Sequence, residues 1–406
     1  MTPSFDVVII GGGQAGGEVA AGLRARRYSG SVLLVTDEEH LPYSRPPLSK
    51  AYLRGLVSAD DLLLRPARFY AEHDITVRTS ARVVSLDPDA GALVLDDGER
   101  VAWKKVVLAT GGRPRRLPET VLPPSDNVHY VRTLADVDRL RATRIDGASF
   151  VVVGGGYVGL EIASVLARLG ARITLVEAAD RLLARVTSPV MSEYFLRLHR
   201  SEGVDVRVST SVRSFRRSSE GRVVEVEVDD GSVISTDEVL VGIGMIPNTE
   251  LAEAAGIAVD NGIVVDRYGR TRADGVYAIG DVANVVDAGA PGRRLESMPN
   301  AAAHARVVAD HIVGTALPHT DAPWFWSDQY DLKLQAAGTF QGADEVVVRG
   351  DPATTSVCAL YLADGLLRGV DAIGRPVDYA AARKILNRGG RIDPDTLAEG
   401  RPLAAL

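Results

Sequence analysis

The 406-residue sequence predicts an α/β fold with two Rossmann-like domains and a C-terminal α+β domain. First, a glycine-rich turn between an apolar run and a helical pattern occurs twice, at residues 11–16 and 154–159. Second, several other apolar runs end in glycine or another small residue, as strands do at the ligand-binding edge of a parallel sheet. Third, the chain from about residue 321 onward has no such turn and contains short strand-like runs.

The first copy of the pattern begins with the apolar run FDVVII at residues 5–10, which leads into GGGQAG at residues 11–16. Val19 and Leu23 then follow at helical spacing, and a second apolar run ends in Asp37. The order is therefore strand, glycine turn, helix, strand and acid.

The second copy has the run FVVV at residues 150–153, the turn GGGYVG at residues 154–159, a helical pattern and a second strand that ends in Glu177. In this arrangement glycines let the backbone approach a pyrophosphate, the helix N-terminus offers free N–H groups, and the acid accepts hydrogen bonds from ribose hydroxyls. One G-x-G-x-x-G motif is weak evidence, but two copies with the full pattern predict two dinucleotide-binding domains. The predicted binding residues are Gly11, Gly13, Gly16 and Asp37 in the first copy, and Gly154, Gly156, Gly159 and Glu177 in the second.

Other segments complete the predicted sheets and the tail. Strands that end in small residues are expected at 105–112, 238–244 and 276–279. Residues 82–101 and 206–238 alternate apolar and polar residues around Asp-Gly pairs, which predicts antiparallel meanders. In the tail, strands are expected at 345–349, 357–362 and 367–372, followed by a helix near 379–386.

The composition excludes several function classes. The net charge is −7, which argues against a general nucleic-acid binder, because neutralising phosphates needs a local excess of Lys and Arg. The single cysteine, Cys358, excludes a disulfide scaffold, a structural zinc site and a CxxC redox pair, and we expect no metal. The N-terminal residues lack the pattern of a signal peptide and no apolar run is long enough to span a bilayer, so we expect a cytoplasmic protein without a membrane partner.

Several segments together carry a family resemblance. They are the two glycine turns, PPLSK at residues 46–50, GIGMIPN at 242–248, Gly280-Asp281, and PWFWSDQY at 323–330. With these segments the sequence resembles the oxygenase-coupled NADH–ferredoxin reductases, a putidaredoxin reductase-like branch of the FAD-dependent pyridine nucleotide-disulfide oxidoreductase superfamily. The resemblance covers nearly the whole chain and implies a discontinuous FAD-binding domain at 1–112 and 243–320, an inserted NAD-binding domain at 113–242, and a C-terminal domain at 321–406.

The resemblance implies an enzyme, an FAD-dependent NADH:ferredoxin oxidoreductase with FAD and NADH as cofactors. Disulfide reductases of the superfamily carry two cysteines after the first turn and some NADH oxidases carry one, but residues 41–53 contain none. Electrons therefore cannot leave the flavin through a thiol there. The resemblance implies that a two-iron two-sulfur ferredoxin accepts them one at a time, for a mono-oxygenase or a dioxygenase. A flavin NADH oxidase and a non-catalytic redox-sensing flavoprotein of the same fold are the alternatives.

The resemblance also implies contacts to the flavin. Asp37 is expected to bind the adenosine ribose of FAD, and Asp281 its ribityl or pyrophosphate region. The further implied contacts are Ala15, Lys50, Val83, Arg132 and Met298, with core packing as the alternative for Val83 and Met298.

Glu177 bears on the choice of pyridine nucleotide. A carboxylate at this position suits the free ribose hydroxyls of NADH and repels the additional phosphate of NADPH. Arg172 and Arg181 lie nearby in the sequence and favour the opposite choice, so NADH preference is an expectation.

Lys50, Glu161 and Trp326 are the implied catalytic residues. The resemblance places Lys50 and Glu161 near the flavin, where an ammonium group stabilises negative charge and a carboxylate keeps that group ionised. The alternative is that both are solvated surface residues. Trp326 is implied to lie beside the flavin on the approach to the ferredoxin, whereas core packing is the alternative for this residue and the preferred account of Phe325 and Trp324.

The implied ferredoxin partner needs a basic patch on the reductase if it is acidic. The resemblance suggests Arg65, Arg306 and Lys333 as contacts. For each of them, a merely solvated charge is the alternative.

Overall fold

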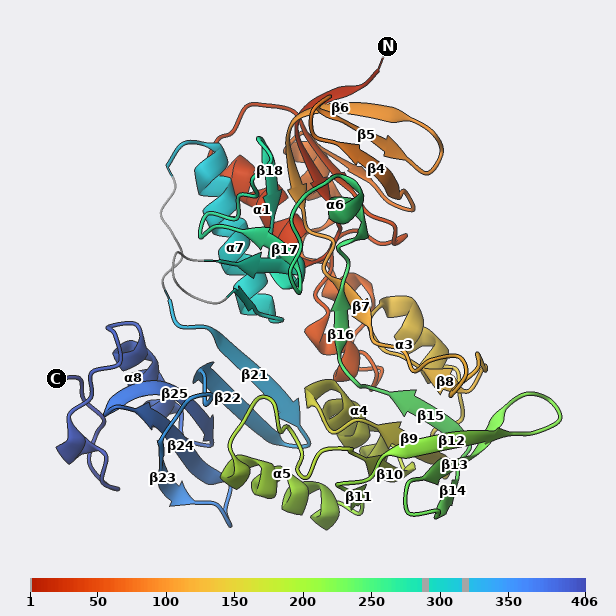
Figure 1. The fold of residues 1–406 in the computed structure, drawn as a ribbon, viewed down its shortest axis with the longest axis vertical. Coiled ribbons are helices and arrows are strands. Elements are labelled where there is room, and N and C mark those ends of the chain that lie inside the picture. The colour runs from red at the N-terminus through yellow and green to blue at the C-terminus, as the bar shows by residue number, and fades with distance from the viewer. Residues whose placement is uncertain (1, 287–291, 316–320) are drawn as a thin grey trace. The chain divides into compact units, whose positions relative to one another are not determined.

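The computed structural model describes residues 2–286, 292–315 and 321–406, and the chain forms two compact units. Unit 1 contains residues 1–46, 58–113 and 245–320, and unit 2 contains residues 47–57, 114–244 and 321–406. Both units combine helices with strands (Figure 1), which confirms the predicted α/β class.

The main sheet of unit 1 is built around β1 (Ser4–Ile10). Its parallel neighbours are β2 (Val32–Val35) and β6 (Arg100–Leu108), and β3 (Ile75–Arg78) and β18 (Val276–Ala278) continue the parallel sheet on either side. The antiparallel strands β4 (Val83–Asp87) and β5 (Ala92–Leu95) extend from the first half of β6 and confirm the first predicted meander.

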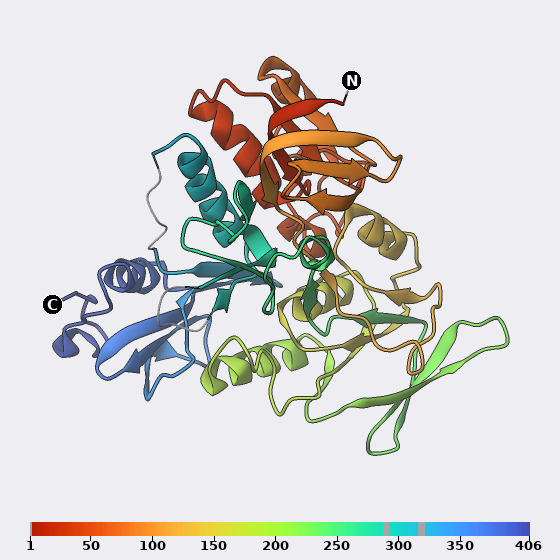
Figure 2. The same ribbon diagram turned by 45° about the horizontal axis from the view of Figure 1, so that its top comes forward.

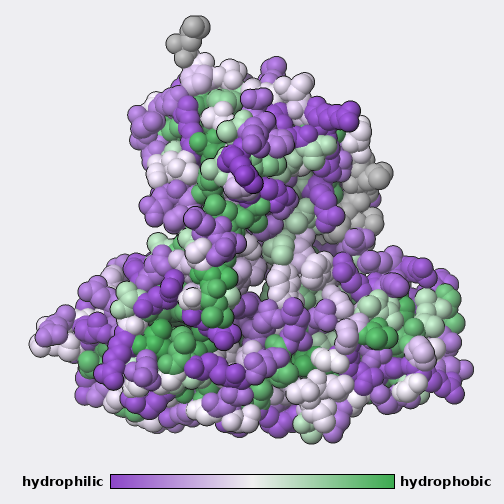
Figure 3. All heavy atoms as spheres, turned by 180° about the vertical axis from the view of Figure 1, so that it is seen from behind, coloured by the Kyte–Doolittle hydropathy of each residue, from purple (hydrophilic) through white to green (hydrophobic). Residues whose placement is uncertain are grey.

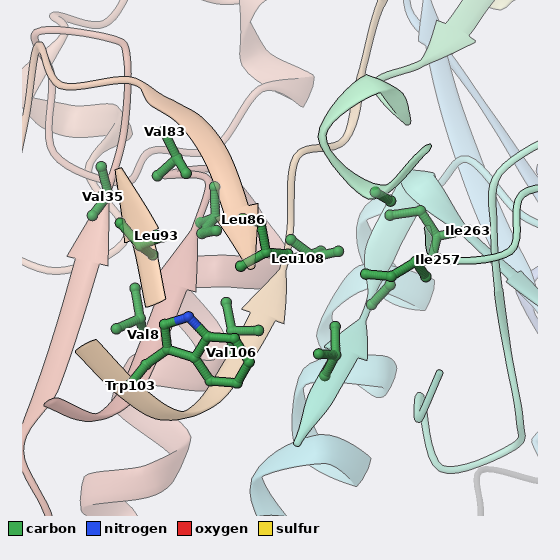
Figure 4. Close-up of a cluster of buried hydrophobic side chains, with 14 of the residues drawn as sticks. Val8, Val35, Val83, Leu86, Leu93, Trp103, Val106, Leu108, Ile257 and Ile263 are labelled. Atoms are coloured by element: carbon green, nitrogen blue, oxygen red, sulfur yellow. The ribbon is translucent and has the colours of Figure 1, made fainter. Parts of the chain in front are cut away.

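The side chains of β1 alternate between two cores, because successive residues of a strand point to opposite faces of the sheet. Val7 and Ile9 belong to the core that includes α1 (Gln14–Ala25) and α7 (Met298–Ile312), two helices that pack side by side (Figure 1). Val8 and Ile10 belong to the core on the other face, most of which is drawn in Figure 4. Burial on both faces explains why this strand is continuously apolar.

Short elements frame the inserted segment of the chain and complete unit 1. The chain passes into unit 2 after β7 (Gly112–Pro114) begins and returns at β16 (Met245–Pro247). The remaining elements are α2 (Ala67–Glu72), α6 (Glu250–Ala254), and a small sheet of β17 (Ile263–Val265), β19 (Ala283–Val285) and β20 (Arg293–Arg294).

A second parallel sheet lies in the inserted part of unit 2. Its strand order is β11 (Asp205–Arg207), β10 (Arg172–Val176), β9 (Ser149–Val153), β15 (Glu238–Val241) and β8 (Val128–His129). The helix α4 (Tyr157–Arg168) connects β9 to β10, as α1 connects β1 to β2. Two further helices, α3 (Leu134–Arg141) and α5 (Pro189–Ser201), precede β9 and β11.

The second predicted meander is also present in unit 2. It consists of β12 (Val212–Arg217), β13 (Val223–Val228) and β14 (Val233–Ser235), paired antiparallel. Figure 2 shows β12 and β13 as a projecting light-green hairpin.

The C-terminal part of unit 2 is an antiparallel sheet covered by one helix. The strands, in sheet order, are β21 (Trp324–Gln329), β22 (Leu332–Gly338), β25 (Leu366–Ile373), β24 (Ser356–Ala363) and β23 (Glu345–Asp351). The helix α8 (Pro376–Leu386) packs on the sheet through Tyr379, Ala382 and Ile385. The three strands and the helix predicted in the tail are confirmed, whereas β21 and β22 are not among the predicted strands.

Three further observations concern the helices, the possible metal ligands and the surface. Within the described residues, no helix is both long and apolar enough to cross a bilayer, and no three His, Cys, Asp or Glu side chains are grouped as a metal site would require. On the face drawn in Figure 3, hydrophilic residues are widely distributed, with apolar residues in smaller areas between them.

Candidate functional site

The first glycine turn, residues 11–16, connects β1 to α1. Gly11 has a φ of +118°, and a Cβ atom on it would lie 2.2 Å from the carbonyl oxygen of Ala109. A Cβ atom on Gly16 would lie 2.0 Å from the carbonyl oxygen of Gly11. In contrast, a Cβ atom on Gly13, the N-cap of α1, would meet no described atom within 4 Å. The fold therefore requires the first and third glycines, and the second leaves open space in front of the helix.

The second glycine turn, residues 154–159, repeats this geometry between β9 and α4. Gly154 has a φ of +106°, and its Cβ atom would lie 2.5 Å from the carbonyl oxygen of Gly242. A Cβ atom on Gly159 would lie 2.2 Å from the carbonyl oxygen of Gly154. A Cβ atom on Gly156, the N-cap of α4, would again meet no described atom within 4 Å.

Both turns fit the pyrophosphate of a dinucleotide. Among the described residues, no side chain caps the N-terminus of α1 or α4, so the first N–H groups and the positive end of each helix dipole are available to an anion. The missing Cβ atoms at Gly13 and Gly156 leave room for the phosphates to approach. The structure thus provides two similar helix starts without a side-chain cap, one in each unit.

The two copies differ where their second strand ends. In both copies the N–H group of the first glycine donates to the carbonyl oxygen of the last residue of the second strand, at 2.8 Å. By this correspondence, Thr36 follows the strand in the first copy where Glu177 follows it in the second. Asp37 lies one residue later and is exposed, so the two predicted acids are not structural equivalents.

Glu177 is fixed at the end of its strand by backbone groups. Its Oε2 atom accepts a hydrogen bond from the N–H group of Gly155 at 2.6 Å, and its Oε1 atom accepts one from Ala179 at 2.8 Å. Arg181 donates to two carbonyl oxygens and a serine hydroxyl, and Arg172 donates to a carbonyl oxygen. Both arginines are thus hydrogen-bonded to groups other than Glu177.

Three further predicted flavin contacts lie near the starts of α1 and α7 in unit 1. Ala15 is buried in the first turn of α1, and Gly280 lies against it, because a Cβ atom on Gly280 would be 3.0 Å from the Ala15 Cβ atom. Asp281 belongs to the short 3-10 turn Gly280–Val282, which packs against α7, and Met298 is the first residue of α7. The structure therefore brings Ala15 and Asp281 together beside the first turn.

Val83 and Arg132 have other surroundings. The side chain of Val83 is 9% exposed and packs in the core shown in Figure 4, which corresponds to the core-packing alternative. Arg132 belongs to unit 2, where its N–H group donates to Asp136 Oδ2 at 3.0 Å, just before α3.

Lys50 and Glu161 form an ion pair in unit 2, with the carboxylate buried and the lysine partly buried. Lys50 Nζ lies 2.7 Å from Glu161 Oε2, and Glu161 is only 3% exposed. Ser49 Oγ donates to the same carboxylate oxygen at 2.5 Å, and Ser327 Oγ donates to Glu161 Oε1 at 2.7 Å. Three donors thus stabilise a carboxylate that would otherwise be costly to bury. Glu161 is therefore not the solvated residue of the alternative interpretation.

Three separate segments bring this pair together. Glu161 lies on α4 in the turn after Gly156, Lys50 follows the 3-10 turn Pro46–Ser49, and Ser327 lies on β21. Residues 47–57 belong to unit 2, although the chain on both sides of them belongs to unit 1. This excursion of the chain is what places Lys50 beside Glu161.

Strand alternation separates the aromatic residues of β21 into two groups. Phe325, Ser327 and Gln329 share one face, where the Phe325 ring lies 4.6 Å from the ring of Tyr157 on α4. Trp324 and Trp326 share the other face, where their rings stack at 5.7 Å with an interplanar angle of 30°.

The two indoles have different neighbours. Trp324 packs against the core of the C-terminal sheet, and the guanidinium group of Arg383 lies 4.9 Å from its ring centroid. Trp326 is only partly buried and stacks on Trp324. These contacts fit core packing for Trp324 and leave the role of Trp326 a prediction.

Four further residues of this site are not among the predicted ones: Ser49, Ser327, Gln329 and His199. Ser327 and Gln329 lie within PWFWSDQY, and alternation along a strand would have placed both beside Phe325. His199 lies on α5 and bonds to Gln329 at 2.9 Å, a contact across 130 residues that has no local sequence signal.

The three predicted partner contacts are divided between the two units. Arg65 and Arg306 belong to unit 1 and Lys333 belongs to unit 2. Arg65 is 3.7 Å from Glu18, and Lys333 is 3.8 Å from Asp328. Their role in partner binding therefore stays a prediction.

Cys358 is unsuited to thiol chemistry. It is fully buried in β24, and burial raises the pKa of its thiol to about 12. A thiol of this kind stays protonated at physiological pH and is a poor nucleophile.

Comparison with known proteins agrees with this architecture. The family model described as pyridine nucleotide-disulphide oxidoreductase matches residues 5–305, and the model described as reductase C-terminal matches residues 324–405. The chain is 43% identical to the 5,5'-dehydrodivanillate O-demethylase ferredoxin reductase subunit of Sphingobium sp. strain SYK-6, covering 98% of this chain and 97% of that protein. It is also 43% identical to rhodocoxin reductase of Rhodococcus erythropolis, covering 97% of this chain and 92% of that protein.

Among solved structures, the reductase of a covalent putidaredoxin reductase–putidaredoxin complex matches with a TM-score of 0.94 and 39% identity, over 98% of this chain and 96% of that chain. These matches confirm the predicted family, the oxidoreductase assignment and the use of FAD and NAD(H). The chain belongs to the pyridine nucleotide-disulphide oxidoreductase family and, within it, is similar to the ferredoxin reductases of oxygenase systems.

Proposed function

We propose that this chain is an FAD-dependent NADH:ferredoxin reductase that delivers electrons singly to a two-iron two-sulfur ferredoxin, which in turn serves a mono-oxygenase or a dioxygenase. The observation that carries this proposal is the pair of Lys50 with the buried Glu161, because Lys50 lies in the segment where thiol-dependent members of the superfamily have cysteines. The single cysteine is buried in β24 instead, so the electrons need an acceptor outside the chain. The names of the relatives, all ferredoxin or rhodocoxin reductases, support a ferredoxin as that acceptor.

The first glycine turn is proposed to hold FAD and the second NADH. When bound, FAD would accept two electrons from NADH and release them one at a time. The residues proposed for FAD are Gly11, Gly13, Ala15, Gly16, Asp37, Lys50, Val83, Arg132, Asp281 and Met298; those for NADH are Gly154, Gly156, Gly159 and Glu177. The proposed domains are 1–112 with 243–320 for FAD, 113–242 for NAD, and 321–406 at the C-terminus.

Lys50 and Glu161 are proposed to tune the redox centre. The ammonium group of Lys50 stabilises the negative charge that reduction brings, and Glu161 keeps this group ionised and in place. Replacing Lys50 with Met should slow the reduction of the flavin by NADH about a hundredfold, because one preorganised charge is lost. Stopped-flow absorbance at the flavin band measures this rate, and an unchanged rate would remove Lys50 from the mechanism.

NADH, rather than NADPH, is the proposed electron donor. Both oxygens of Glu177 are held at the end of β10, where a carboxylate repels an additional phosphate. Arg172 is the first residue of β10, at the opposite end of the strand from Glu177, and Arg181 donates to the carbonyl oxygens of Thr187 and Ala184. Because NADH is supplied in the cytoplasm, we place the reaction there.

The proposed ferredoxin contacts are Arg65, Arg306 and Lys333, with Trp326 on the path of the electron. Arg306 is exposed on α7 and the Lys333 side chain is 60% exposed, so both can meet an acidic partner. If this surface steers the ferredoxin, its reduction rate should fall steeply with ionic strength.

The decisive experiment measures cytochrome c reduction by the holoenzyme with NADH, with and without putidaredoxin as a two-iron ferredoxin. A large ferredoxin-dependent increase supports the proposal. Rapid oxygen consumption that ferredoxin does not change would instead identify an NADH oxidase. A flavin that NADH reduces but that passes electrons to neither acceptor would identify a redox-sensing protein.

A further inference from the structure

We propose that Tyr330, His199, Gln329 and Ser327 form a one-way chain of hydrogen bonds, with every donor directed toward Glu161, and that this chain positions the Glu161 carboxylate for its pairing with Lys50. The importance of Glu161 for electron transfer rests on the function proposed above. The hydrogen-bond chain itself lies entirely within unit 2.

The hydrogen-bond chain is continuous from Tyr330, in the turn between β21 and β22, to the buried carboxylate of Glu161. Tyr330 Oη lies 3.2 Å from His199 Nδ1, and His199 Nε2 lies 2.9 Å from Gln329 Oε1. Gln329 Nε2 donates to Ser327 Oγ at 3.3 Å, and Ser327 Oγ donates to Glu161 Oε1 at 2.7 Å. Each group thus contacts the next, and β21 supplies two members of the chain at alternate positions.

The direction of every bond follows from the carboxylate at its inner end. An ionised carboxylate only accepts hydrogen bonds, so Ser327 must donate to Glu161 and its oxygen is left to accept from the Gln329 amide nitrogen. The amide oxygen of Gln329 then faces His199, so His199 must carry its proton on Nε2. His199 Nδ1 is consequently an acceptor, and Tyr330 donates to it.

Three members of the hydrogen-bond chain are fully buried. Ser327 and Gln329 are each 1% exposed and His199 is 0% exposed, so water does not compete for their hydrogen bonds. Burial also lowers the pKa of His199 to about 4, with the bond to Gln329 acting against this shift. His199 is therefore neutral at physiological pH and has one N–H group, as the one-way chain requires.

Tyr330, at the outer end of the hydrogen-bond chain, has a strained backbone conformation. Tyr330 is the first residue of the two-residue turn between β21 and β22 and has a φ of +53°, a conformation that glycine or asparagine adopts more readily. The Arg168 guanidinium group lies 5.5 Å from the Tyr330 ring centroid and donates to Asp331 at 2.8 Å. Arg168 and Glu161 both lie on α4, so the same helix contacts both ends of the chain.

The first test reads the position of a proton rather than activity. In protein labelled with nitrogen-15 in histidine, the ring shifts of His199 at pH 7 should show the Nε2–H tautomer, and they should not titrate between pH 5.5 and 8. An Nδ1–H tautomer or a mixture would overturn the chain, whatever the enzyme reduces. The ring signals of a second buried histidine serve as the internal reference. This residue, His129, lies on β8, 2.8 Å from Glu238, and its signals are identified by their loss in His129→Phe.

The second test uses rescue by a side chain of the same length. In the holoenzyme without ferredoxin, His199→Phe removes the donor to Gln329 and should slow flavin reduction by NADH about five- to tenfold, the effect of one lost hydrogen bond. His199→Gln keeps an N–H group at the same reach and should restore the rate to within about twofold. Equal rates in these two variants would contradict the positioning role.

A third variant breaks the hydrogen-bond chain at its centre. In Gln329→Met neither an amide oxygen faces His199 nor an amide nitrogen faces Ser327, so both central hydrogen bonds are lost. Flavin reduction should slow at least as much as in His199→Phe, and the flavin midpoint potential should shift, whereas His129→Phe should change neither. A rate in Gln329→Met equal to that of the unmodified enzyme would overturn the proposal. The tautomer reading stands on the unmodified protein, so a variant that fails to fold leaves the proposal testable.

The outcomes also separate this proposal from the proposed function. If His199 is the Nε2–H tautomer and the rescue pattern is seen, but the protein reduces no ferredoxin, the hydrogen-bond chain is supported and the proposed function is refuted. If the protein reduces ferredoxin but His199 is the Nδ1–H tautomer, the proposed function is supported and the hydrogen-bond chain is refuted.

Discussion

The two glycine turns have the same backbone geometry but different strand ends beside them. In both, a Cβ atom on the first or third glycine would collide with a carbonyl oxygen, and a Cβ atom on the second would meet no described atom within 4 Å. The second strand, however, is followed by Thr36 in the first copy and by Glu177 in the second. Glu177 bonds to the N–H group of its own turn, whereas the exposed Asp37 lies one residue further along the chain.

The shared geometry fits a feature that the two proposed ligands have in common. FAD and NADH both contain a pyrophosphate, which the glycine turn and the helix start are proposed to bind. Both also contain an adenosine ribose, so the two strand ends differ although they are proposed to face the same part of the ligand. Substitutions at matched positions of the two copies can therefore test the turns and the strand ends separately.

The largest effect is expected when the first glycine of either turn is replaced. Gly11→Ala and Gly154→Ala place a Cβ atom 2.2 and 2.5 Å from a carbonyl oxygen, at φ values of +118° and +106°. Each should lower the free energy of unfolding by roughly 3–5 kcal/mol, through strain and displaced backbone. Urea denaturation followed by circular dichroism measures this loss, and a loss below about 1 kcal/mol in either variant would show that the turn can relax.

A somewhat smaller effect is expected on the pH dependence of stability, because unit 2 contains buried groups that titrate. Asp371 accepts hydrogen bonds from Thr187 and Tyr361, and burial raises its pKa from 3.8 to about 6. Between these values the unfolded chain is ionised while the folded chain keeps its proton, so this group lowers stability as pH rises from about 4 to 6, by up to about 3 kcal/mol. Asp371→Asn removes this dependence, so its stability should rise more steeply with pH than that of the unmodified protein.

His199 provides the control with the opposite sign. Its pKa is lowered from 6.5 to about 4, so the unfolded chain takes up a proton first and stability is lost as pH falls through this range. His199→Gln should therefore lose stability more gradually than the unmodified protein as pH falls. Denaturation curves from pH 4 to 7 that change slope in the same direction in both variants would contradict these assignments.

The next effect concerns binding rather than folding. Gly13 and Gly156 have a φ of −82° and extended ψ values, so alanine fits their backbone and the fold should be unaffected. Gly13→Ala should lower the FAD content of the purified protein, and Gly156→Ala should keep FAD but raise the KM for NADH about tenfold, because each new Cβ atom would occupy the open space proposed for a phosphate. Flavin absorbance and steady-state kinetics measure the two effects, and NADH binding that is weakened by Gly13→Ala alone would reverse the assignment of the turns.

The smallest effect concerns nucleotide choice. Glu177→Gln removes the charge but keeps an oxygen for the N–H group of Gly155, and should raise the ratio of kcat/KM for NADPH to that for NADH about tenfold. Thr36→Ala changes the matched position of the first copy and should leave this ratio unchanged. Equal ratios in all three proteins would show that Glu177 does not select the nucleotide.

Much of the fold could be predicted because its signals are local. The two turns, their flanking strands and the strands of the tail each show a pattern within a short window of sequence. The strand β21 was missed because three of its six residues are aromatic, and its alternation is visible only when Phe325, Ser327 and Gln329 are set against Trp324 and Trp326. The offset between Asp37 and Glu177 was missed because both lie near the end of an apolar run, and only hydrogen bonds show which residue follows the strand.

The sequence by itself determined the two glycine turns, the family and the absence of a second cysteine, because glycine positions, strand patterns and residue counts are properties of short segments or of composition. The family resemblance implied that Lys50 and Glu161 lie near one another, but only the tertiary structure decided which other groups surround Glu161. Lys50 and Ser327 are separated from it by 111 and 166 residues, and they meet it because residues 47–57 join unit 2 and β21 packs against α4. Contacts of that range arise from packing of whole elements, for which no periodicity in the sequence provides a signal.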